Sequence, residues 1–303
     1  MTARTHPQRP VWAETPGILG RTGKGVALVA IALVVVLPIY VVVLTSLSPA
    51  ESINRAGGLV LVPDGLSFAA YTELFAGGVV TRAVLVSLGV TVVGTAVSLG
   101  ATVLAAYGLS RPGSLWHRPL LFTVLLTFLF GPGMIPLYLL VSSLGLIDSY
   151  WSLILPAAVN AFNVVVMRAF FMNIPAEIGD SARVDGASEW RILTRLVLPM
   201  SKGVTAVIGL FYAVGYWNAF FNAVLYINDN SRWPLQVILR QYVLQQQSIT
   251  AGSLVDPSTA TALPPNLAIQ MAIVVVALVP VTLVYPLVQR HFTKGVIIGA
   301  VKG

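Results

Sequence analysis

The sequence predicts an all-α, polytopic membrane protein with six transmembrane helices. Hydrophobic residues make up 56% of the chain and charged residues only 10%, whereas an ordinary soluble protein carries about 25% charged residues. A helix crosses the bilayer core with about 20 apolar residues. Six uncharged stretches approach or exceed this length: residues 25–50, 83–110, 119–147, 149–167, 203–228 and 257–289.

Each stretch is expected to be a helix, because backbone amides in lipid find their partners within the segment. The first, residues 25–50, follows a polar and basic segment, residues 1–24. It is longer than the apolar run of a signal peptide, so we interpret it as a retained anchor helix. The other five belong to a core over residues 80–290, and a tail follows over residues 291–303.

Prolines and glycines interrupt several of these stretches. Gly131, Pro132 and Gly133 fall within the third stretch. Single prolines lie there and in three others, at Pro38, Pro136, Pro156 and Pro280. Such residues bend a helix and leave carbonyl groups for neighbouring groups to satisfy. The kinks serve either as hinges of a gate or as static packing features, and the sequence leaves both open.

The basic residues indicate how the helices are oriented. With the N-terminus in the cytoplasm, four of the 18 lysines and arginines fall outside, at Arg55, Arg82, Arg232 and Arg240, and the other 14 fall on the cytoplasmic side. Cytoplasmic loops of membrane proteins carry such an excess. We therefore expect both termini in the cytoplasm, and we attribute the net charge of +7 to membrane orientation rather than to nucleic-acid binding.

One cytoplasmic loop, expected over residues 174–202, is highly charged. Pro175 suits the first turn of a helix, and Asp185 with Gly186 is a turn signal that divides the loop into two short helices. Small or apolar residues form two sets, Ile178, Ser181, Ala182, Gly186 and Ala187 in the first and Trp190, Leu193, Leu196 and Val197 in the second. The loop is either simply solvated or a helical element that docks into the groove of a partner.

This loop resembles a known signature. The stretch DSARVDGASEWRILTRLVLP is similar to the pattern E-A-A-x3-G-x9-I-x-L-P of binding-protein-dependent ABC importer permeases. Asp180, Ser181 and Ala182 stand at E-A-A, Gly186 keeps the spacing, and Leu196, Leu198 and Pro199 close the pattern. Aspartate replaces glutamate, serine replaces alanine and leucine replaces isoleucine, while the spacing is intact.

The resemblance implies an ABC importer type I permease fold, with a loop that docks on a separate ATPase subunit. The residues that it assigns to this coupling are Asp180, Ser181, Ala182, Asp185, Gly186, Ala187, Leu196, Leu198 and Pro199. The tail HFTKGVIIGAVKG resembles that of maltose-type carbohydrate permeases, which implies an ATPase contact through Lys294, Gly295, Gly299 and Lys302. The stretches YWNAFFNAVLYINDNSRWPLQVILRQYV and YPLVQRHFTKGV resemble the subgroup that imports oligosaccharides derived from polysaccharides.

The same resemblance implies the partners and the location. The partners are a second, different permease subunit, two ATPase subunits that bind ATP and Mg²⁺, an extracytoplasmic sugar-binding protein and the lipid of a bacterial inner or plasma membrane. Residues 227–266 form the external loop, in which a short interfacial helix is predicted by Pro234, Leu235, Ile238, Leu239 and Tyr242. This loop is either a docking surface for the binding protein or a lid, and no cofactor is expected on this chain.

Polar residues inside the predicted helices are candidates for a transport pathway. They are neutral, which argues against a proton or sodium relay, and amides beside aromatic rings suit a hydroxyl-rich solute. The candidates are Asn160, Asn163, Tyr216, Trp217, Asn218, Asn222 and Gln270. Hydrogen bonding between helices is the alternative role for each of them.

Other classes of function fit less well. The chain has no cysteine and three histidines, which fall in terminal or loop segments, so no catalytic residue and no metal site are expected. The stretch GRTGKG lacks the spacing of a phosphate-binding loop. An ABC permease for another small polar solute and a non-transporting membrane scaffold remain as alternatives.

Overall fold

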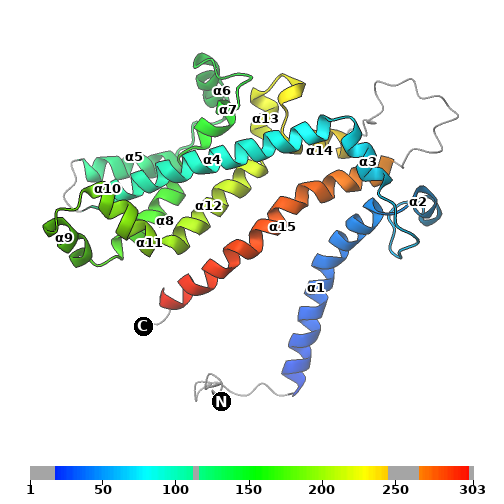
Figure 1. The fold of residues 1–303 in the computed structure, drawn as a ribbon, viewed down its shortest axis with the longest axis horizontal. Coiled ribbons are helices and arrows are strands. Elements are labelled where there is room, and N and C mark those ends of the chain that lie inside the picture. The colour runs from blue at the N-terminus through cyan, green and yellow to red at the C-terminus, as the bar shows by residue number, and fades with distance from the viewer. Residues whose placement is uncertain (1–17, 112–115, 245–265, 300–303) are drawn as a thin grey trace.

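The computed structural model describes residues 18–111, 116–244 and 266–299, and every regular element in these ranges is helical (Figure 1). The all-α prediction is therefore confirmed. The longer helices are α1 (Ile18–Ser46), α4 (Val79–Ser110), α5 (His117–Leu129), α6 (Met134–Ser143), α8 (Ala161–Met172), α12 (Lys202–Trp217), α14 (Leu235–Leu244) and α15 (Asn266–Gly299). The shorter ones are α2 (Ala50–Ala56), α3 (Ala69–Ala76), α7 (Trp151–Ile154), α9 (Ala176–Val184), α10 (Glu189–Ile192), α11 (Leu198–Met200) and α13 (Phe221–Tyr226), with the 3₁₀ helices η1 (Leu155–Ala157) and η3 (Asn230–Arg232) and the π-helix η2 (Leu193–Val197).

Within the described ranges, three helical segments are each long and apolar enough to cross a membrane, namely Thr22–Ser46, α4 and Leu267–Val284. Three pairs of helices joined by a bend are also long and apolar enough when each pair is counted as one span. This gives up to six spans, the number that the sequence predicts. The pairs are α5 with α6, α7 and η1 with α8, and residues 189–200 with α12, and they bend by 117°, 52° and 87°. Half of these six candidate spans are thus bent, and the third pair combines α12 with residues 189–200, which were predicted to belong to a cytoplasmic loop.

The glycines and the proline at residues 131–133 cause the sharpest break. Pro132 has no N–H group to continue a helix, and Gly133 has φ of +79°, a conformation that favours glycine. The expected interruption of the third stretch is confirmed there. Pro38 and Pro280, in contrast, lie inside the continuous helices α1 and α15.

The last two predicted spans differ in extent from the observed helices. The fifth was expected over residues 203–228, but α12 ends at Trp217, and the chain turns before α13 begins at Phe221. The sixth was expected over residues 257–289. The structure begins α15 at Asn266 and extends it to Gly299, so part of the predicted tail is helical, while residues 257–265 and 300–303 lie outside the described residues.

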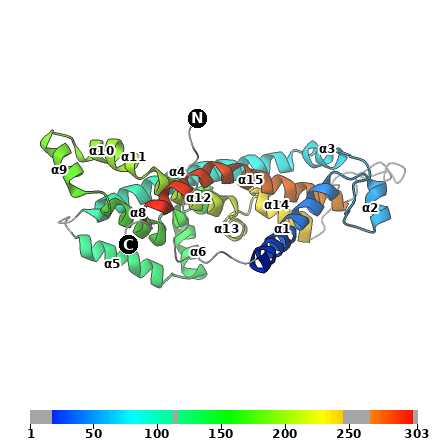
Figure 2. The ribbon, with the colours of Figure 1, turned by 90° about the horizontal axis from the view of Figure 1, so that it is seen from below.

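Helix α4 forms the centre of the molecule. It packs against α8 and α12, and α15 packs against α12 and α1. The core is apolar and includes Met167, Ile208 and Ile273, none of which is exposed. Figures 1 and 2 both place α9, α10 and α11 at one end of α4 and α2 and α3 at the other. The two ends of the bundle are therefore built from different chain segments.

Helix α1 diverges from the rest of the bundle (Figure 1). Its apolar side chains from Val26 to Leu37 are mostly more than half exposed in the isolated chain, and burial begins only near Val41. An apolar surface of this extent is typical of a segment that contacts lipid or another protein.

Candidate functional sites

The first candidate site is the charged hairpin, defined here as residues 176–200, which comprise α9, α10, η2 and α11. Helix α9 ends at Val184, and Gly186 has φ of +76°. The Ala187 N–H donates to the Ala182 carbonyl (2.9 Å) and the Gly186 N–H to the Arg183 carbonyl (3.0 Å), the pair of bonds that closes a helix at a left-handed glycine. The predicted division into two helices at Asp185 and Gly186 is confirmed.

The residues around this turn fix both helix ends. Pro175 stands one position before α9, as its N-cap, rather than inside the first turn as predicted. Ser188 begins α10 by accepting a hydrogen bond from the Arg191 N–H (3.4 Å). Serine is a favoured residue at this position because its hydroxyl satisfies an otherwise free backbone donor.

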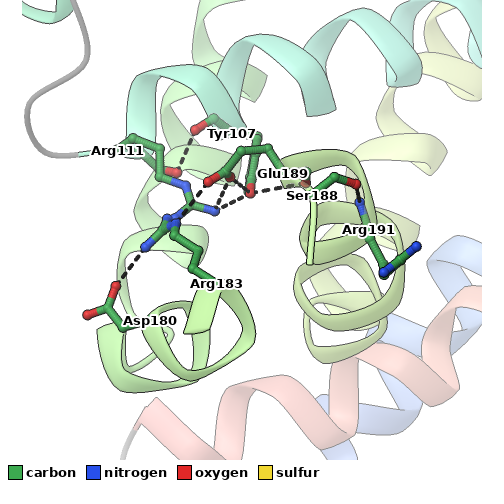
Figure 3. A network of polar contacts seen from close by, with 8 residues as sticks. Tyr107, Arg111, Asp180, Arg183, Ser188, Glu189 and Arg191 are labelled. Atoms are coloured by element: carbon green, nitrogen blue, oxygen red, sulfur yellow. Dashed lines mark hydrogen bonds and ion pairs between the residues drawn. The ribbon is translucent and has the colours of Figure 1, made fainter. Parts of the chain in front are cut away.

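A network of charged side chains joins the hairpin to the end of α4 (Figure 3). The Tyr107 hydroxyl donates to Glu189 Oε2 (2.5 Å), and Arg111 Nη2 lies 2.9 Å from the same oxygen. Arg183 Nε donates to Glu189 Oε1 (2.9 Å), and Arg183 Nη1 pairs with Asp180 Oδ1 (2.6 Å). Glu189 thereby connects α4, α9 and α10 through one carboxylate.

The charge state of Glu189 is set by these neighbours. The hydrogen bond from the Tyr107 hydroxyl, followed by the contacts of Arg183, holds the pKa of the Glu189 carboxyl below its usual value. The carboxylate is therefore ionised at neutral pH and attracts both arginines. Because the Glu189 side chain is 56% exposed, solvent screens the attraction, and the network orients the helices more than it stabilises them.

A cavity of about 570 Å³ lies between this network and the chain that leads into α9. Tyr107 and Arg111 line it from α4, Phe171 from α8, and Ile178 and Glu189 from the hairpin. Gly179 also lines it, and a methyl group there would lie 3.7 Å from Arg111 Nη1, within ordinary contact distance. Helix α9 is thus held beside α4 by polar contacts, whereas Leu193 and Val197 of the same hairpin are buried in the apolar core.

The predicted coupling residues occupy different environments in the hairpin. Asp180, Ser181, Asp185, Gly186 and Pro199 are exposed, whereas Ala182, Ala187, Leu196 and Leu198 are half-buried. The expected second apolar set is corrected, because Leu193 and Val197 are buried in the core of this chain and are closed to a partner. Val184, Trp190 and Met200 remain exposed, by 87%, 66% and 52%, and are the large apolar side chains of the hairpin that a partner can reach.

The second candidate site is the break between α7 and α8, where two tyrosines of α12 satisfy free backbone groups. The Tyr216 hydroxyl donates to the Ile154 carbonyl (3.1 Å), and the Tyr212 hydroxyl accepts from the Asn160 N–H (3.0 Å). Both tyrosines are buried. A broken helix at membrane depth requires such partners, because water is not available to supply them.

Two hydroxyls of α4 complete this arrangement. Ser98 and Thr102 lie one helical turn apart, and each shares a 2.7 Å hydrogen bond with a tyrosine, Ser98 with Tyr216 and Thr102 with Tyr212. Gly94 makes the close approach possible, since a Cβ atom at this position would lie 2.8 Å from the Tyr216 ring. We call Ser98, Thr102, Tyr212 and Tyr216 the hydroxyl ladder.

A cavity of about 560 Å³ adjoins the hydroxyl ladder. Four of the seven predicted pathway residues line it, namely Asn160, Asn163, Tyr216 and Asn222. Asn160 is also the N-cap of α8, where its side chain accepts from the Asn163 N–H (3.2 Å). Tyr212 lines the cavity as well, so the cavity presents amides and two phenols beside apolar walls.

The other three predicted pathway residues lie elsewhere. Trp217 donates from Nε1 to the Ala277 carbonyl of α15 (3.0 Å), and Gln270 donates to the Tyr242 carbonyl (2.9 Å). Asn218 is exposed and donates to the Val214 carbonyl of its own helix (2.9 Å). These contacts fit the alternative role of hydrogen bonding within and between helices.

At the opposite end of α4 from the hairpin, Asp148 joins two loops. Its Oδ1 accepts from the backbone N–H groups of Asn228 (2.5 Å) and Asp229 (2.9 Å), and its own N–H donates to the Tyr226 carbonyl (2.8 Å). Arg232 donates to the Asp148 carbonyl. The hydrogen bond from the Asp229 N–H, followed by those of Asn228 and the charge of Arg232, lowers the pKa of the Asp148 carboxyl.

The sequence reading missed most of these partners. It gave no role to Tyr107, Arg111, Arg183 and Glu189, nor to Ser98, Thr102 and Tyr212. A local signal existed for the hydroxyl ladder. Ser98 and Thr102 on α4 are four residues apart, as are Tyr212 and Tyr216 on α12, and this spacing places both members of a pair on one helix face. Among the described residues no cluster of three or more metal-binding side chains occurs.

The predicted tail contact is only partly described. Lys294, Gly295 and Gly299 lie on the helical backbone of α15, and Lys302 lies outside the described residues. The contact of this tail with an ATPase therefore stays a prediction.

The chain is similar to known transport proteins. Residues 94–298 match the family described as "Binding-protein-dependent transport system inner membrane component". The chain is 45% identical over 276 residues to the polygalacturonan/rhamnogalacturonan transport system permease protein YtcP of Bacillus subtilis (strain 168), over 91% of this chain and 96% of the relative. It is 30% identical over 278 residues to the arabinooligosaccharides transport system permease protein AraQ of the same organism, over 90% and 92% of the two chains.

A solved structure shares the fold. It is a crystal structure of a bacterial ABC transporter involved in the import of the acidic polysaccharide alginate, matched with a TM-score of 0.83 and 30% sequence identity. The match covers 94% of this chain and 100% of the other.

Proposed function

Because the chain belongs to the family of binding-protein-dependent transport system inner membrane components, we propose that it is the permease subunit of an importer whose cargo is an oligosaccharide. The family predicted from the loop signature is confirmed. Its members are membrane subunits of ABC importers, and the helical composition agrees with such a role. The names of three similar proteins specify transport of polygalacturonan/rhamnogalacturonan, transport of arabinooligosaccharides and import of alginate, which supports a sugar as cargo.

One observation carries the coupling role, and it is the connection of the charged hairpin to α4. Trp190 and Val184 offer an exposed apolar surface to a partner, while Glu189 binds Tyr107 and Arg111 of α4. A protein that moves the hairpin therefore also moves α4. We assign this surface to contact with an ATPase subunit. ATP and Mg²⁺ bind to that subunit and not to this chain.

The transport cycle follows from population shift. The ATP-bound state of two ATPase subunits favours one spacing of the two hairpins, one on this chain and one on a second permease subunit. A ligand shifts an equilibrium only by binding one state better than the other, so ATP drives the change because it binds the closed ATPase pair preferentially. The cavity beside the hydroxyl ladder forms this subunit's half of the pathway, which opens toward a soluble sugar-binding protein on the outer face.

The orientation is testable because the chain contains no cysteine. We expect both termini and the charged hairpin in the cytoplasm of a bacterial cell. In a Trp190→Cys variant, a membrane-impermeant maleimide is expected to react only after lysis. In a Val62→Cys variant, at the exposed Val62 between α2 and α3, it is expected to react in intact cells, and the reverse pattern would refute the orientation.

The coupling role is tested at Gly186. Valine there adds backbone strain of about 1–2 kcal/mol because φ is +76°, and the added side chain meets no atom within 4 Å. We expect less sugar uptake for each ATP hydrolysed by the assembled transporter. Gly57→Val is the matched control, since Gly57 has φ of +68° and equally open surroundings at the other end of the molecule. Equal coupling ratios in both variants would remove the hairpin from the mechanism.

A further inference from the structure

A groove of about 380 Å³ lies near the cavity that adjoins the hydroxyl ladder, which we call the transport cavity. The proposed function gives this groove no role. Phe220 and Phe221 line it from the start of α13, Trp233 from the loop before α14, and Arg240 and Gln241 from α14 itself. Phe221 is 57% exposed. The groove thus combines three aromatic rings with one guanidinium and one amide.

Arg240 differs from the other arginines that were predicted on the outer side. Arg55 pairs with Asp64, and Arg232 pairs with Asp229 (3.4 Å). Arg82 lies close enough to Asp229 to contribute to the lowered pKa of that carboxyl, after the hydrogen bonds from Ser231 and the charge of Arg232. In the described part of the chain Arg240 has no carboxylate partner, and its guanidinium carbon lies 4.5 Å from the centre of the Phe220 ring.

We propose that this groove binds a sugar unit that carries a carboxylate, a uronate, with Arg240 as the residue that recognises the carboxylate. The guanidinium presents a planar fork of N–H donors that matches a carboxylate in bidentate geometry. Stacking on Phe220 holds the guanidinium in place while its edge stays free to donate. The inference rests on the proposed function, because it names the chemical class of the sugar.

The aromatic rings and the amide suit the rest of the sugar ring. Phe221 and Trp233 offer flat apolar faces, and pockets of several hundred Å³ lined in this way are typical of small-molecule sites. Gln241 provides both a donor and an acceptor for hydroxyl groups. The groove therefore matches the two chemical faces of a uronate, the charged group and the ring.

Helix α13 contributes to both the groove and the cavity beside the hydroxyl ladder. Phe221 and Val224 of α13 line the groove, while Asn222 of the same helix lines the cavity. The name of one similar protein specifies transport of polygalacturonan, and that of another specifies import of the acidic polysaccharide alginate. A chain of uronates that enters the groove is thus adjacent to the pathway that we propose for it.

The test compares two probes, trigalacturonate and its methyl ester, which lacks the negative charges and carries a methyl group on each carboxyl. Equilibrium binding of each is measured on the assembled transporter in lipid nanodiscs, without the soluble binding protein. We expect the wild-type protein to bind the acid about tenfold or more tightly than the ester, in line with hydrogen bonds to a charged group. In Arg240→Gln this preference is expected to vanish, and in Arg240→Lys to be partly retained. Arg55→Gln, an outer arginine already paired with Asp64, is expected to keep the full preference.

Other outcomes overturn the inference. If Arg240→Gln weakens both probes equally, the arginine acts on the fold or on docking and not on the carboxylate. If the wild-type protein binds neither probe or prefers neither, the groove is not a uronate site. Uptake of oligosaccharides by the intact system with its binding protein is measured in parallel, and it decides the proposed function separately from the groove.

Discussion

The charged hairpin and the hydroxyl ladder solve the same structural problem in opposite ways. In both places a helix is interrupted and polar groups must find partners. At the hairpin the partners are ions, and Glu189 is 56% exposed. At the ladder they are neutral hydroxyls, and Tyr216 is only 5% exposed. Burying unpaired charge costs far more than burying a hydrogen-bonded hydroxyl. The exposed break is therefore satisfied by ion pairs, and the buried break by neutral hydroxyl groups.

The comparison predicts that the ladder responds to changes of shape and the hairpin to changes of charge. Gly94→Val is expected to have the largest effect on stability, because the new side chain overlaps the Tyr216 ring that a Cβ atom alone would approach to 2.8 Å. Overpacking of this kind costs about 3 kcal/mol. Thermal unfolding of the purified protein measures it.

Gly89→Val serves as the control for this change. Gly89 lies on the same helix, and a Cβ atom there would have no atom within 4 Å. The unfolding temperature of the Gly89→Val variant is therefore expected to stay close to the wild-type value. Equal losses at Gly94 and Gly89 would mean that the effect belongs to helix propensity and not to the ladder.

Tyr216→Phe is expected to have a smaller effect on stability. The change removes the bond to the Ile154 carbonyl and leaves the Ser98 hydroxyl without its partner, which costs about 1–3 kcal/mol for buried groups. Denaturant or thermal unfolding is again the measurement. The control is Tyr138→Phe, since Tyr138 stacks on Tyr226 and its hydroxyl has no hydrogen-bond partner in the described part of the chain, and similar losses in both variants would contradict the proposed role of the ladder.

Glu189→Gln is expected to change stability by less than about 1 kcal/mol, because its ion pairs are exposed to solvent. Its effect should appear in coupling, since Arg111 and Arg183 lose the carboxylate that joins them. We expect ATP hydrolysis to continue with reduced sugar uptake. Glu177→Gln, on the same hairpin, is the control, and an unchanged ratio of uptake to hydrolysis in Glu189→Gln would show that the network does not transmit movement.

The smallest expected effect concerns Asp148 and pH. Its folded pKa is lowered, so its carboxylate stabilises the loop contact above the ordinary pKa of an aspartate, about 3.9, and this contribution is lost as pH falls through the folded pKa. The unfolding temperatures of wild-type and Asp148→Asn proteins are expected to differ at pH 7, and the difference is expected to shrink as the pH falls from the ordinary pKa of an aspartate toward the lowered folded pKa. A difference that does not vary with pH would assign the contact to shape alone.

The same comparison explains what the sequence could predict. Long uncharged stretches predicted the number of spans because a charge in lipid is costly at any position. Asp185 and Gly186 predicted the hairpin turn because left-handed backbone favours glycine. The partners of Glu189 were not predictable, since Arg111 is separated from it by 78 residues and no local pattern records that distance.

Pro156 indicated an interruption near the break between α7 and α8, but the partners of the backbone groups at this break were not predictable. Hydrophobicity shows that a segment is apolar, but it does not show which backbone groups lack a partner. Tyr216 was a candidate for the transport pathway because it is polar and lies within a predicted span, with hydrogen bonding between helices as the alternative. Its hydroxyl instead satisfies the Ile154 carbonyl, while its ring still lines the cavity, so one side chain serves the fold and borders the pathway.

The length of α4 has a mechanical consequence. Its 32 residues span about 48 Å at 1.5 Å for each residue, and no break divides them. Ser87 accepts the Leu235 N–H (2.8 Å) near one end and so fastens α14 to this rod, while Tyr107 and Arg111 fasten the hairpin near the other. A tilt of about 5° about one end of such a rod displaces the other by about 4 Å. A small rotation that begins at the hairpin thus reaches the helix that carries Arg240 without passing through any flexible joint.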